Sequence, residues 1–335
     1  MKRRATVLVP LAVLAAACSS GPRATSLLSF SGQNGRIAFS TNRSGNVDIW
    51  LADADGSHRT RLTSDPAADI QPRWSPDGST IAFTSYRTGN GDLYTIRSDG
   101  SALRRVTTAA AFDGYPTWSP DGTRLGFVST RSGNLDVWVQ TLSSGKTVQL
   151  TSNWADDFAP AWSPAGGRIA FTSNRGHNSD IYVMDADGSH ERQVTTDSHA
   201  DAYPTWSPDG SLIMFQSDRK GNYDLWTKTA DGTGLARVSK NSSFDGYPAW
   251  SPDGTRILFV SQRSGSQDLW AAGATGSSPA SLIANFGPMT WPDWQSVPLP
   301  PPTPSPSPSD TSSPSPSPSP SDTSSPIPSA TPTGP

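Results

Sequence analysis

The sequence predicts an all-β fold, a six-bladed β-propeller with four antiparallel strands in each blade. A tryptophan recurs every 44 residues, and five of its six copies open a Trp-Ser-Pro-Asp-Gly segment or, once, Trp-Ser-Pro-Ala-Gly. A fixed period of about 40–50 residues is typical of propellers and related arrays. Each unit also holds four short β-type runs separated by turn signals, and no segment has helical periodicity. The repeated tryptophans are Trp74, Trp118, Trp162, Trp206, Trp250 and Trp294.

The unit that follows Trp74 illustrates the order of the strands. Its first apolar run is Ile-Ala-Phe at 81–83, and the second is Asp-Leu-Tyr at 92–94. An Asp-Gly turn at 99–100 leads to the third run, Arg-Arg-Val-Thr at 104–107. Asp and Gly suit this turn because they accept the positive φ of tight hairpins. A longer loop then leads to the next Pro-x-Trp segment, which supplies the fourth strand.

The two ends of the repeat predict how the ring closes. Phe30 stands where a first tryptophan would be expected, whereas the last copy supplies Pro-Asp-Trp at 292–294 with no strand after it. We expect this C-terminal strand to be the innermost strand of the blade whose other three strands come from residues 35–63. Such pairing removes a free edge from the ring. The alternative, an innermost strand at 27–30, lacks the Pro and the Trp.

The repeat resembles the TolB-type β-propeller. Its units read Pro-x-Trp-Ser-Pro-Asp-Gly, Ile-Ala-Phe, Ser-x-Arg-x-Gly-Asn-x-Asp-Ile-Trp, Asp-Gly-Ser and Arg-Leu-Thr, and the pattern covers about residues 30–296. The resemblance implies a propeller that serves as a docking platform for proteins. It does not extend to the separate N-terminal α/β domain of TolB, because residues 19–34 are too few to form one.

The N-terminal segment predicts export and a lipid anchor. A basic start, an apolar run at 5–17 and small residues before Cys18 have the layout of a signal peptide. The stretch Leu-Ala-Ala-Ala-Cys at 14–18 resembles a bacterial lipobox. This resemblance implies removal of residues 1–17, acylation of Cys18, and anchoring to the cell membrane facing the periplasm or the cell exterior. Cleavage at a nearby alanine, which would leave a soluble secreted protein, is the alternative.

Two further segments flank the predicted propeller. Residues 18–29 are expected to form a short tether. Residues 297–335 are rich in Pro, Ser and Thr and cannot bury a core, so a disordered tail is expected. Cys18 is the single cysteine of the chain, which excludes an internal disulfide.

The charge of the chain argues against a nucleic-acid partner. Its formal net charge is −3. Removal of residues 1–17 would take away three basic residues and no acidic one, so the mature protein would be more acidic still. A nucleic-acid-binding face would instead need clustered basic residues to neutralise phosphates.

One arginine and two aspartates recur in the units. We expect Arg–carboxylate pairs, within or between blades, because a guanidinium can bind a carboxylate through two parallel hydrogen bonds. A ring of free carboxylates that binds a cation in the central channel is the alternative. The arginines are Arg43, Arg87, Arg131, Arg175, Arg219 and Arg263. The aspartates that follow them by five residues are Asp48, Asp92, Asp136, Asp180, Asp224 and Asp268. The aspartates of the long loops are Asp69, Asp113, Asp157, Asp201 and Asp245, with Met289 in the sixth copy.

The copies differ most in the long loops, three residues before each tryptophan. These positions read Gln71, Tyr115, Ala159, Tyr203, Tyr247 and Trp291, with Phe112, Trp154, Phe158 and Phe244 nearby. We take Tyr115, Tyr203, Tyr247 and Trp291, with the loop aspartates Asp69, Asp113, Asp157, Asp201 and Asp245, as the candidate binding face. Exposed aromatic rings interleaved with carboxylates suit a peptide or a sugar. Alternatively, the tyrosines pack between blades beneath the loops.

The sequence gives no sign of catalysis. The four histidines fall at different positions of the repeat and make no metal-ligand spacing. No Gly-x-Ser-x-Gly elbow is present, and no cofactor motif is found. We therefore expect a non-enzymatic scaffold without metal or cofactor, whose partner is an envelope protein or peptide. A carbohydrate-binding or sensing module and a metal-dependent lyase or hydrolase with its site in the channel are the alternatives.

Overall fold

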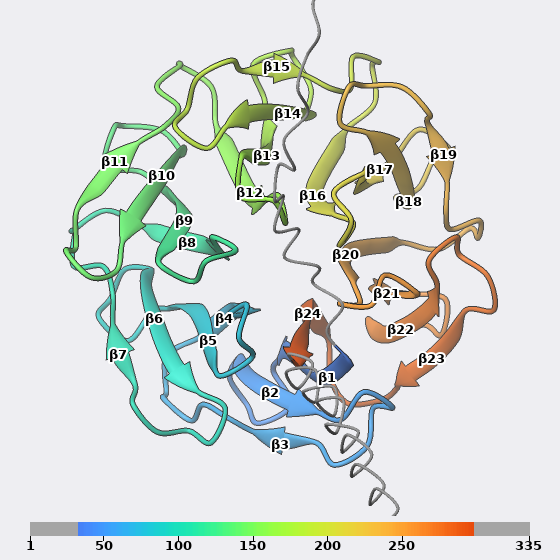
Figure 1. Cartoon of the computed structure of the whole chain (residues 1–335). Coiled ribbons are helices and arrows are strands. Elements are labelled where there is room, and N and C mark those ends of the chain that lie inside the picture. The colour runs from blue at the N-terminus through green and yellow to red at the C-terminus, as the bar shows by residue number, and fades with distance from the viewer. Residues whose placement is uncertain (1–32, 298–335) are drawn as a thin grey trace, which may run out of the picture. The chain divides into compact units, whose positions relative to one another are not determined.

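A computed structural model describes residues 33–297, which form six four-stranded antiparallel sheets arranged as a ring (Figure 1). The predicted six-bladed propeller is confirmed. The predicted signal peptide (1–17), the tether (18–29) and residues 298–335 of the predicted tail (297–335) lie outside the described residues. Val297, the first residue of the predicted tail, is instead the last residue of a strand. In the part of the chain that the structure describes, no helix is long and apolar enough to cross a membrane.

Each blade contributes one strand to each of four layers around the central channel (Figure 1). The innermost strands are β24 (Met289–Val297), β4 (Asp69–Trp74), β8 (Asp113–Trp118), β12 (Asp157–Trp162), β16 (Asp201–Trp206) and β20 (Asp245–Trp250). The second strands are β1 (Gln33–Thr41), β5 (Thr80–Ser85), β9 (Arg124–Ser129), β13 (Arg168–Ser173), β17 (Leu212–Ser217) and β21 (Arg256–Ser261). The third strands are β2 (Asp48–Ala52), β6 (Asp92–Arg97), β10 (Asp136–Thr141), β14 (Asp180–Asp185), β18 (Asp224–Thr229) and β22 (Asp268–Gly273). The outermost strands are β3 (Thr60–Arg61), β7 (Arg104–Arg105), β11 (Thr147–Gln149), β15 (Arg192–Gln193), β19 (Ala236–Arg237) and β23 (Ala280–Ile283).

The ring closes as the sequence predicts. Strand β24 pairs antiparallel with β1, so that Trp294 lies opposite Ile37 in a sheet of order β24-β1-β2-β3. The first blade is therefore built from both ends of the described chain. The non-covalent seam lies between β1 and β24, inside a blade, where backbone hydrogen bonds hold it.

The core lies within and between the blades. One phenylalanine in the middle of each second strand is at most 1% exposed. The repeated tryptophans pack between neighbouring blades. Trp74, for example, packs in one cluster with Ala38 and Leu51 of the first blade and Phe83 of the second. The buried phenylalanines are Phe39, Phe83, Phe127, Phe171, Phe215 and Phe259.

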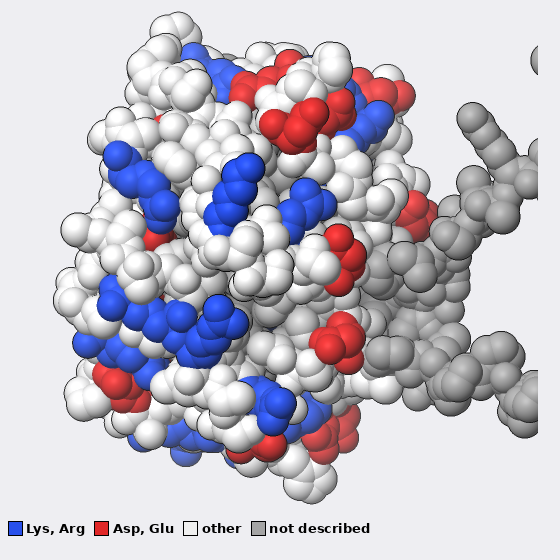
Figure 2. Space-filling view, turned by 60° about the vertical axis from the view of Figure 1, so that its left-hand side comes forward, with Lys and Arg blue, Asp and Glu red and all other residues white. Residues whose placement is uncertain are grey.

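The ring has two chemically different faces. The long-loop face carries the loops that enter the innermost strands and the hairpins that contain the repeated arginines. The turn face carries the Ser-Pro-Asp-Gly turns that leave the innermost strands. Around the outer side of the ring, Lys and Arg side chains gather on the surface shown in Figure 2, and acidic side chains stand mainly toward the rims. The negative charge of the chain is therefore not spread evenly over its surface.

In five of the six blades the repeated arginine binds the loop aspartate of the same blade, as one of the predicted pairings. Arg219 Nη2 donates to both carboxylate oxygens of Asp201 at 2.8 Å, and its Nε donates to Ser217 Oγ at 2.8 Å. The guanidinium also lies 4.8 Å from the ring centre of Trp226. Each pair thus ties the start of the innermost strand to the hairpin on the same face. The pairs are Arg87–Asp69, Arg131–Asp113, Arg175–Asp157, Arg219–Asp201 and Arg263–Asp245.

The first blade departs from this pattern at Met289. Because no carboxylate stands there, Arg43 instead lies over the ring of Phe286, 4.3 Å from its centre. Met289 is fully buried in the cluster that joins the last blade to the first. An apolar contact therefore replaces the ion pair at the blade that closes the ring.

The aspartates that follow the repeated arginines by five residues begin the third strands. Their partners include side chains of the outermost strands rather than the repeated arginines. In the second blade, Arg105 of the outermost strand binds Asp92 at 2.7 Å. In the fourth blade, Gln193 holds the same place and donates to Asp180 at 3.0 Å. Burial raises the pKa of Asp180 to about 6, and the negative charges of nearby aspartates add to this effect. The fourth blade therefore contains a buried carboxylate without its cation.

Replacement of Gln193 by arginine is expected to stabilise the protein by about 1 kcal/mol at neutral pH, the value of a charge-assisted hydrogen bond discounted for partial exposure. The folded pKa of Asp180, about 6, lies above the unfolded value of about 3.9, so wild-type stability falls as the pH rises from about 4 to 6. In the Gln193→Arg variant the guanidinium lowers the pKa of Asp180 in the folded protein and so removes part of this loss of stability. Urea unfolding at pH 7.5 should show the gain, and at pH 4 it should be absent. Gln193→Met is the control, and an equal gain at both pH values would contradict the explanation.

Candidate functional site

A backbone irregularity aims one side chain of every innermost strand at the channel. Three residues before each tryptophan the backbone is left-handed, with φ between 47° and 59°, and the pairing register with the second strand shifts there. Such β-bulges redirect a side chain relative to regular alternation. The residues concerned are Gln71, Tyr115, Ala159, Tyr203, Tyr247 and Trp291.

Side chains of the neighbouring blade bind backbone N–H groups at the bulges. The N–H of Tyr203 donates to Thr172 Oγ1 at 3.1 Å. The N–H of Tyr247 donates to Gln216 Oε1 at 3.2 Å. Because these acceptors come from the preceding blade, inter-blade packing fixes the bulge and hence the direction of the aromatic ring.

The redirected aromatic rings meet at the centre of the disc. Tyr115, Tyr203, Tyr247 and Trp291 form a closed cycle with ring centres 5.1–6.4 Å apart. Phe158 contacts two of these rings, and Phe244 connects the cycle to Tyr223. At such spacing each ring packs against its neighbours in the cycle. We call this group the aromatic plate; its members are Tyr115, Phe158, Tyr203, Tyr223, Phe244, Tyr247 and Trp291.

The aromatic surface continues outward on the long-loop face. Phe112 lies against Tyr86, with ring centres 6.4 Å apart, and Tyr86 is 36% exposed. Gly114 makes this possible, since a Cβ at that residue would stand 2.4 Å from the Phe112 ring. Trp154, in the loop before β12, is 77% exposed and is the most exposed of the large apolar side chains described. These rings and the plate together give the face its apolar character.

The structure thus brings the four predicted aromatic residues together, in an arrangement that neither sequence alternative describes. Tyr115, Tyr203, Tyr247 and Trp291 are half-buried. They neither project freely into solvent nor pack between blades, but pack on one another across the channel. Burial raises the pKa of Tyr115, Tyr203 and Tyr247 above that of a free tyrosine, so these hydroxyls stay protonated near neutral pH.

The five predicted acidic members of the face are not available to a partner. Their carboxylates are fully buried, and each is bound to the arginine of its own blade. The expectation that they contribute to the binding face, or form a ring of free carboxylates around a cation, is therefore corrected. The residues are Asp69, Asp113, Asp157, Asp201 and Asp245. Within residues 33–297, no group of three or more His, Cys, Asp or Glu side chains is placed to hold a metal ion.

On the other side of the plate, the channel widens into a chamber of about 260 Å³. Its lining comes entirely from the innermost strands and the turns that follow them, ending at prolines of the turn face such as Pro120 and Pro208. Four rings of the aromatic plate, Tyr115, Tyr203, Tyr247 and Trp291, line the opposite end. The chamber therefore extends from the aromatic plate to the turn face.

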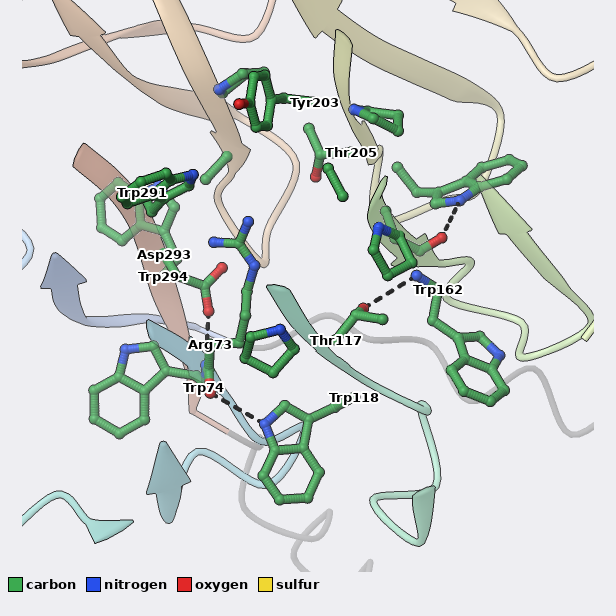
Figure 3. Close-up of a pocket in the computed structure, with 18 of the residues that line it drawn as sticks. Arg73, Trp74, Thr117, Trp118, Trp162, Tyr203, Thr205, Trp291, Asp293 and Trp294 are labelled. Carbon is green, nitrogen blue, oxygen red and sulfur yellow. Dashed lines mark hydrogen bonds between the residues drawn. The ribbon is translucent and has the colours of Figure 1, made fainter. Parts of the chain in front are cut away.

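Two opposite charges stand in the wall of this chamber (Figure 3). They are Arg73 on β4 and Asp293 on β24, at the position immediately before the repeated tryptophan. Asp293 Oδ2 accepts a hydrogen bond from the backbone N–H of Trp74 at 2.7 Å. Burial raises the pKa of Asp293 to about 6, against the opposing effects of the Arg73 charge and of that N–H. At neutral pH the carboxylate is thus mostly ionised.

Our sequence reasoning did not single out Arg73 or Asp293 as site residues. They are 220 positions apart and become neighbours only because the ring closes through β24. The sequence nevertheless contains a signal for these two residues. The residue immediately before the repeated tryptophan differs in charge and polarity from one copy of the repeat to the next. It reads Arg73, Thr117, Ala161, Thr205, Ala249 and Asp293.

Comparisons with known proteins agree with the repeat and the fold. Residues 114–245 match the family model of the TolB beta propeller domain, and residues 25–135 match that of the Tricorn protease N-terminal beta propeller domain. A 45-residue stretch is 44% identical to the Tol-Pal system protein TolB of Anaeromyxobacter dehalogenans (strain 2CP-C) and covers 13% of this chain. The chain spans only 10% of the length of that relative.

Solved structures share the architecture. TolB from Acinetobacter baumannii superposes with a TM-score of 0.70 at 23% identity, covering 78% of this chain and 66% of the other. The putative TolB from Agrobacterium tumefaciens gives 0.62 at 23% identity, covering 79% and 92%. An oligogalacturonate lyase from Vibrio parahaemolyticus gives 0.53 at 13% identity, covering 74% of each chain. At these identities the likeness concerns the fold alone.

Proposed function

We propose, on the premise that this propeller is of the TolB type, that its long-loop face docks a protein or peptide partner. The activity is binding rather than catalysis. The lipobox-like segment ending at Cys18 supports a lipid-anchored location in the cell envelope, outside the cytoplasm. The partner would then be an envelope protein or a peptide segment of one.

The observation that carries this proposal is the aromatic surface of the long-loop face. Its rings stand at positions where the copies of the repeat differ, so the scaffold does not require them. Trp154 and Tyr86 are exposed in loops of the same face. Aromatic residues dominate the energetics of protein interfaces, and exposed apolar patches mark interaction sites.

Affinity capture from the native envelope tests the proposal, with the Trp154→Ala/Tyr86→Ala variant compared to wild type. Loss of an interface hot spot weakens binding by about 2 kcal/mol or more, roughly 30-fold, so the captured partner should disappear. Neither side chain is buried, and the thermal unfolding of the variant should match that of wild type.

A matched control comes from the opposite side of the disc. Leu235 is 45% exposed in the hairpin between β18 and β19, which lies on the turn face. The Leu235→Ala variant should retain the partner. Retention by the Trp154→Ala/Tyr86→Ala variant would overturn the proposal, as would displacement of the partner by soluble cell-wall glycan alone.

A further inference from the structure

We propose that the chamber binds a free α-amino acid, with its carboxylate on Arg73, its ammonium on Asp293 and its apolar side chain against the aromatic plate. The site is on the other side of the plate from the long-loop face. It therefore goes beyond the proposed docking function and does not depend on it.

The two charges of the chamber lack direct partners among the described side chains. No carboxylate oxygen of residues 33–297 lies within 4.0 Å of the Arg73 guanidinium. Its one hydrogen bond to the described residues runs from Nη1 to the carbonyl of Pro72 at 3.3 Å. Asp293 uses Oδ2 for the N–H of Trp74, whereas Oδ1 accepts no hydrogen bond from the described part of the chain. Most of the hydrogen-bonding capacity of both groups therefore remains free.

The presence of one positive and one negative side chain, Arg73 and Asp293, determines which class of ligand the chamber can bind. A simple anion would satisfy Arg73 but would be repelled by Asp293, and a simple cation would meet the reverse problem. Charges away from bulk water are favourable only when each finds a counter-charge and hydrogen bonds. A zwitterion satisfies both groups at once. A guanidinium binds a carboxylate through parallel hydrogen bonds, and a carboxylate accepts hydrogen bonds from an ammonium.

The volume and the lining residues of the chamber further restrict the class of ligand that can bind. A volume of about 260 Å³ is smaller than the roughly 300–1,000 Å³ of pockets for drug-sized ligands, which points to a small molecule. Figure 3 shows Arg73, Asp293, Thr205, Tyr203 and Trp291 around one space. The prolines and tryptophans of the innermost strands, together with Ala161 and Ala249, supply most of the apolar lining. An amino acid with an apolar or aromatic side chain fits this combination.

The test uses the full-length wild-type protein and three related probes. L-phenylalanine, L-phenylalaninamide and N-acetyl-L-phenylalanine are titrated at pH 7.0 by calorimetry. The amide lacks the carboxylate and the acetylated compound lacks the ammonium. We expect phenylalanine to bind at least about tenfold more tightly than either analogue. Equal affinity for all three compounds would overturn the proposal, as would a failure of L-phenylalanine, L-leucine and L-methionine to bind.

Single substitutions test whether Arg73 is responsible for the carboxylate preference and Asp293 for the ammonium preference. Arg73→Met should remove the preference for the acid over the amide but keep the preference for the free ammonium. Asp293→Asn should have the reverse effect. Arg97→Met, at an exposed arginine of the outer surface, is the matched control and should keep both preferences. A general loss of structure cannot produce these opposite selectivities. Binding by Arg73→Met with unchanged preferences would contradict the site.

Discussion

A protein in which alanine replaces Arg219 is expected to lose about 3–5 kcal/mol of its free energy of unfolding, because removal of one partner leaves a buried charge unpaired. The Arg219 side chain is only 8% exposed, and that of Asp201 is fully buried. The same substitution also removes the hydrogen bond to Ser217 and the contact with Trp226. Urea unfolding at pH 7.5 measures the loss.

The first blade supplies the control for this prediction. Arg43 occupies the equivalent hairpin, is exposed, and faces the Phe286 ring without a carboxylate. Arg43→Ala should therefore lower stability by about 1 kcal/mol, the value of a cation–π contact. Burial already raises the pKa of Asp201, and loss of Arg219 removes an opposing effect. The Arg219→Ala loss should accordingly shrink as the pH falls and Asp201 is protonated. Equal losses in the two variants would contradict the role assigned to the ion pair.

A chain shortened to end at residue 288 is expected not to form a stable ring. It lacks β24, and with it the strand pairing to β1 and the burial of Trp294 and Met289. Truncation of one such side chain costs about 2–5 kcal/mol. The combined loss is comparable to the roughly 5–15 kcal/mol that stabilises a whole domain. Circular dichroism and size-exclusion chromatography should show an unfolded or aggregated protein.

The matched control is a chain that ends at residue 297 and retains β24. Its thermal unfolding should resemble that of the full chain. A synthetic peptide of residues 289–297 should restore part of the native signal when added to the shorter chain, because it supplies the missing strand. Native stability in the chain that ends at residue 288 would show that β1 does not need β24, and would refute this account of ring closure.

Much of the fold can be predicted from the sequence because the same local pattern occurs six times. The 44-residue spacing gives the blades, and the unmatched Pro-Asp-Trp at 292–294 gives the closing strand. The Arg–Asp pairs also follow from the pattern, since Arg219 and Asp201 recur at fixed offsets. Their burial does not follow, because exposure depends on how the loops fold over the strand ends.

The candidate site was harder to predict for two physical reasons. The direction of Tyr203 depends on a left-handed bulge, and nothing in strict strand alternation signals this φ of 56°. The Arg73–Asp293 couple depends on ring closure, which brings together residues from the two ends of the propeller. Both features arise from tertiary geometry, so they become visible only when the blades are assembled.

The aromatic plate lies across the channel, between the long-loop face and the chamber. Its rings are shared by two compartments, since Tyr203 and Trp291 belong to the long-loop surface and also line the chamber. A molecule that binds on the long-loop surface and shifts one of these rings would also change the lining of the chamber. Thermodynamic linkage then requires the influence to be mutual, so occupancy of either compartment would change the affinity of the other by the same factor. A single layer of side chains thus forms part of the wall of both compartments.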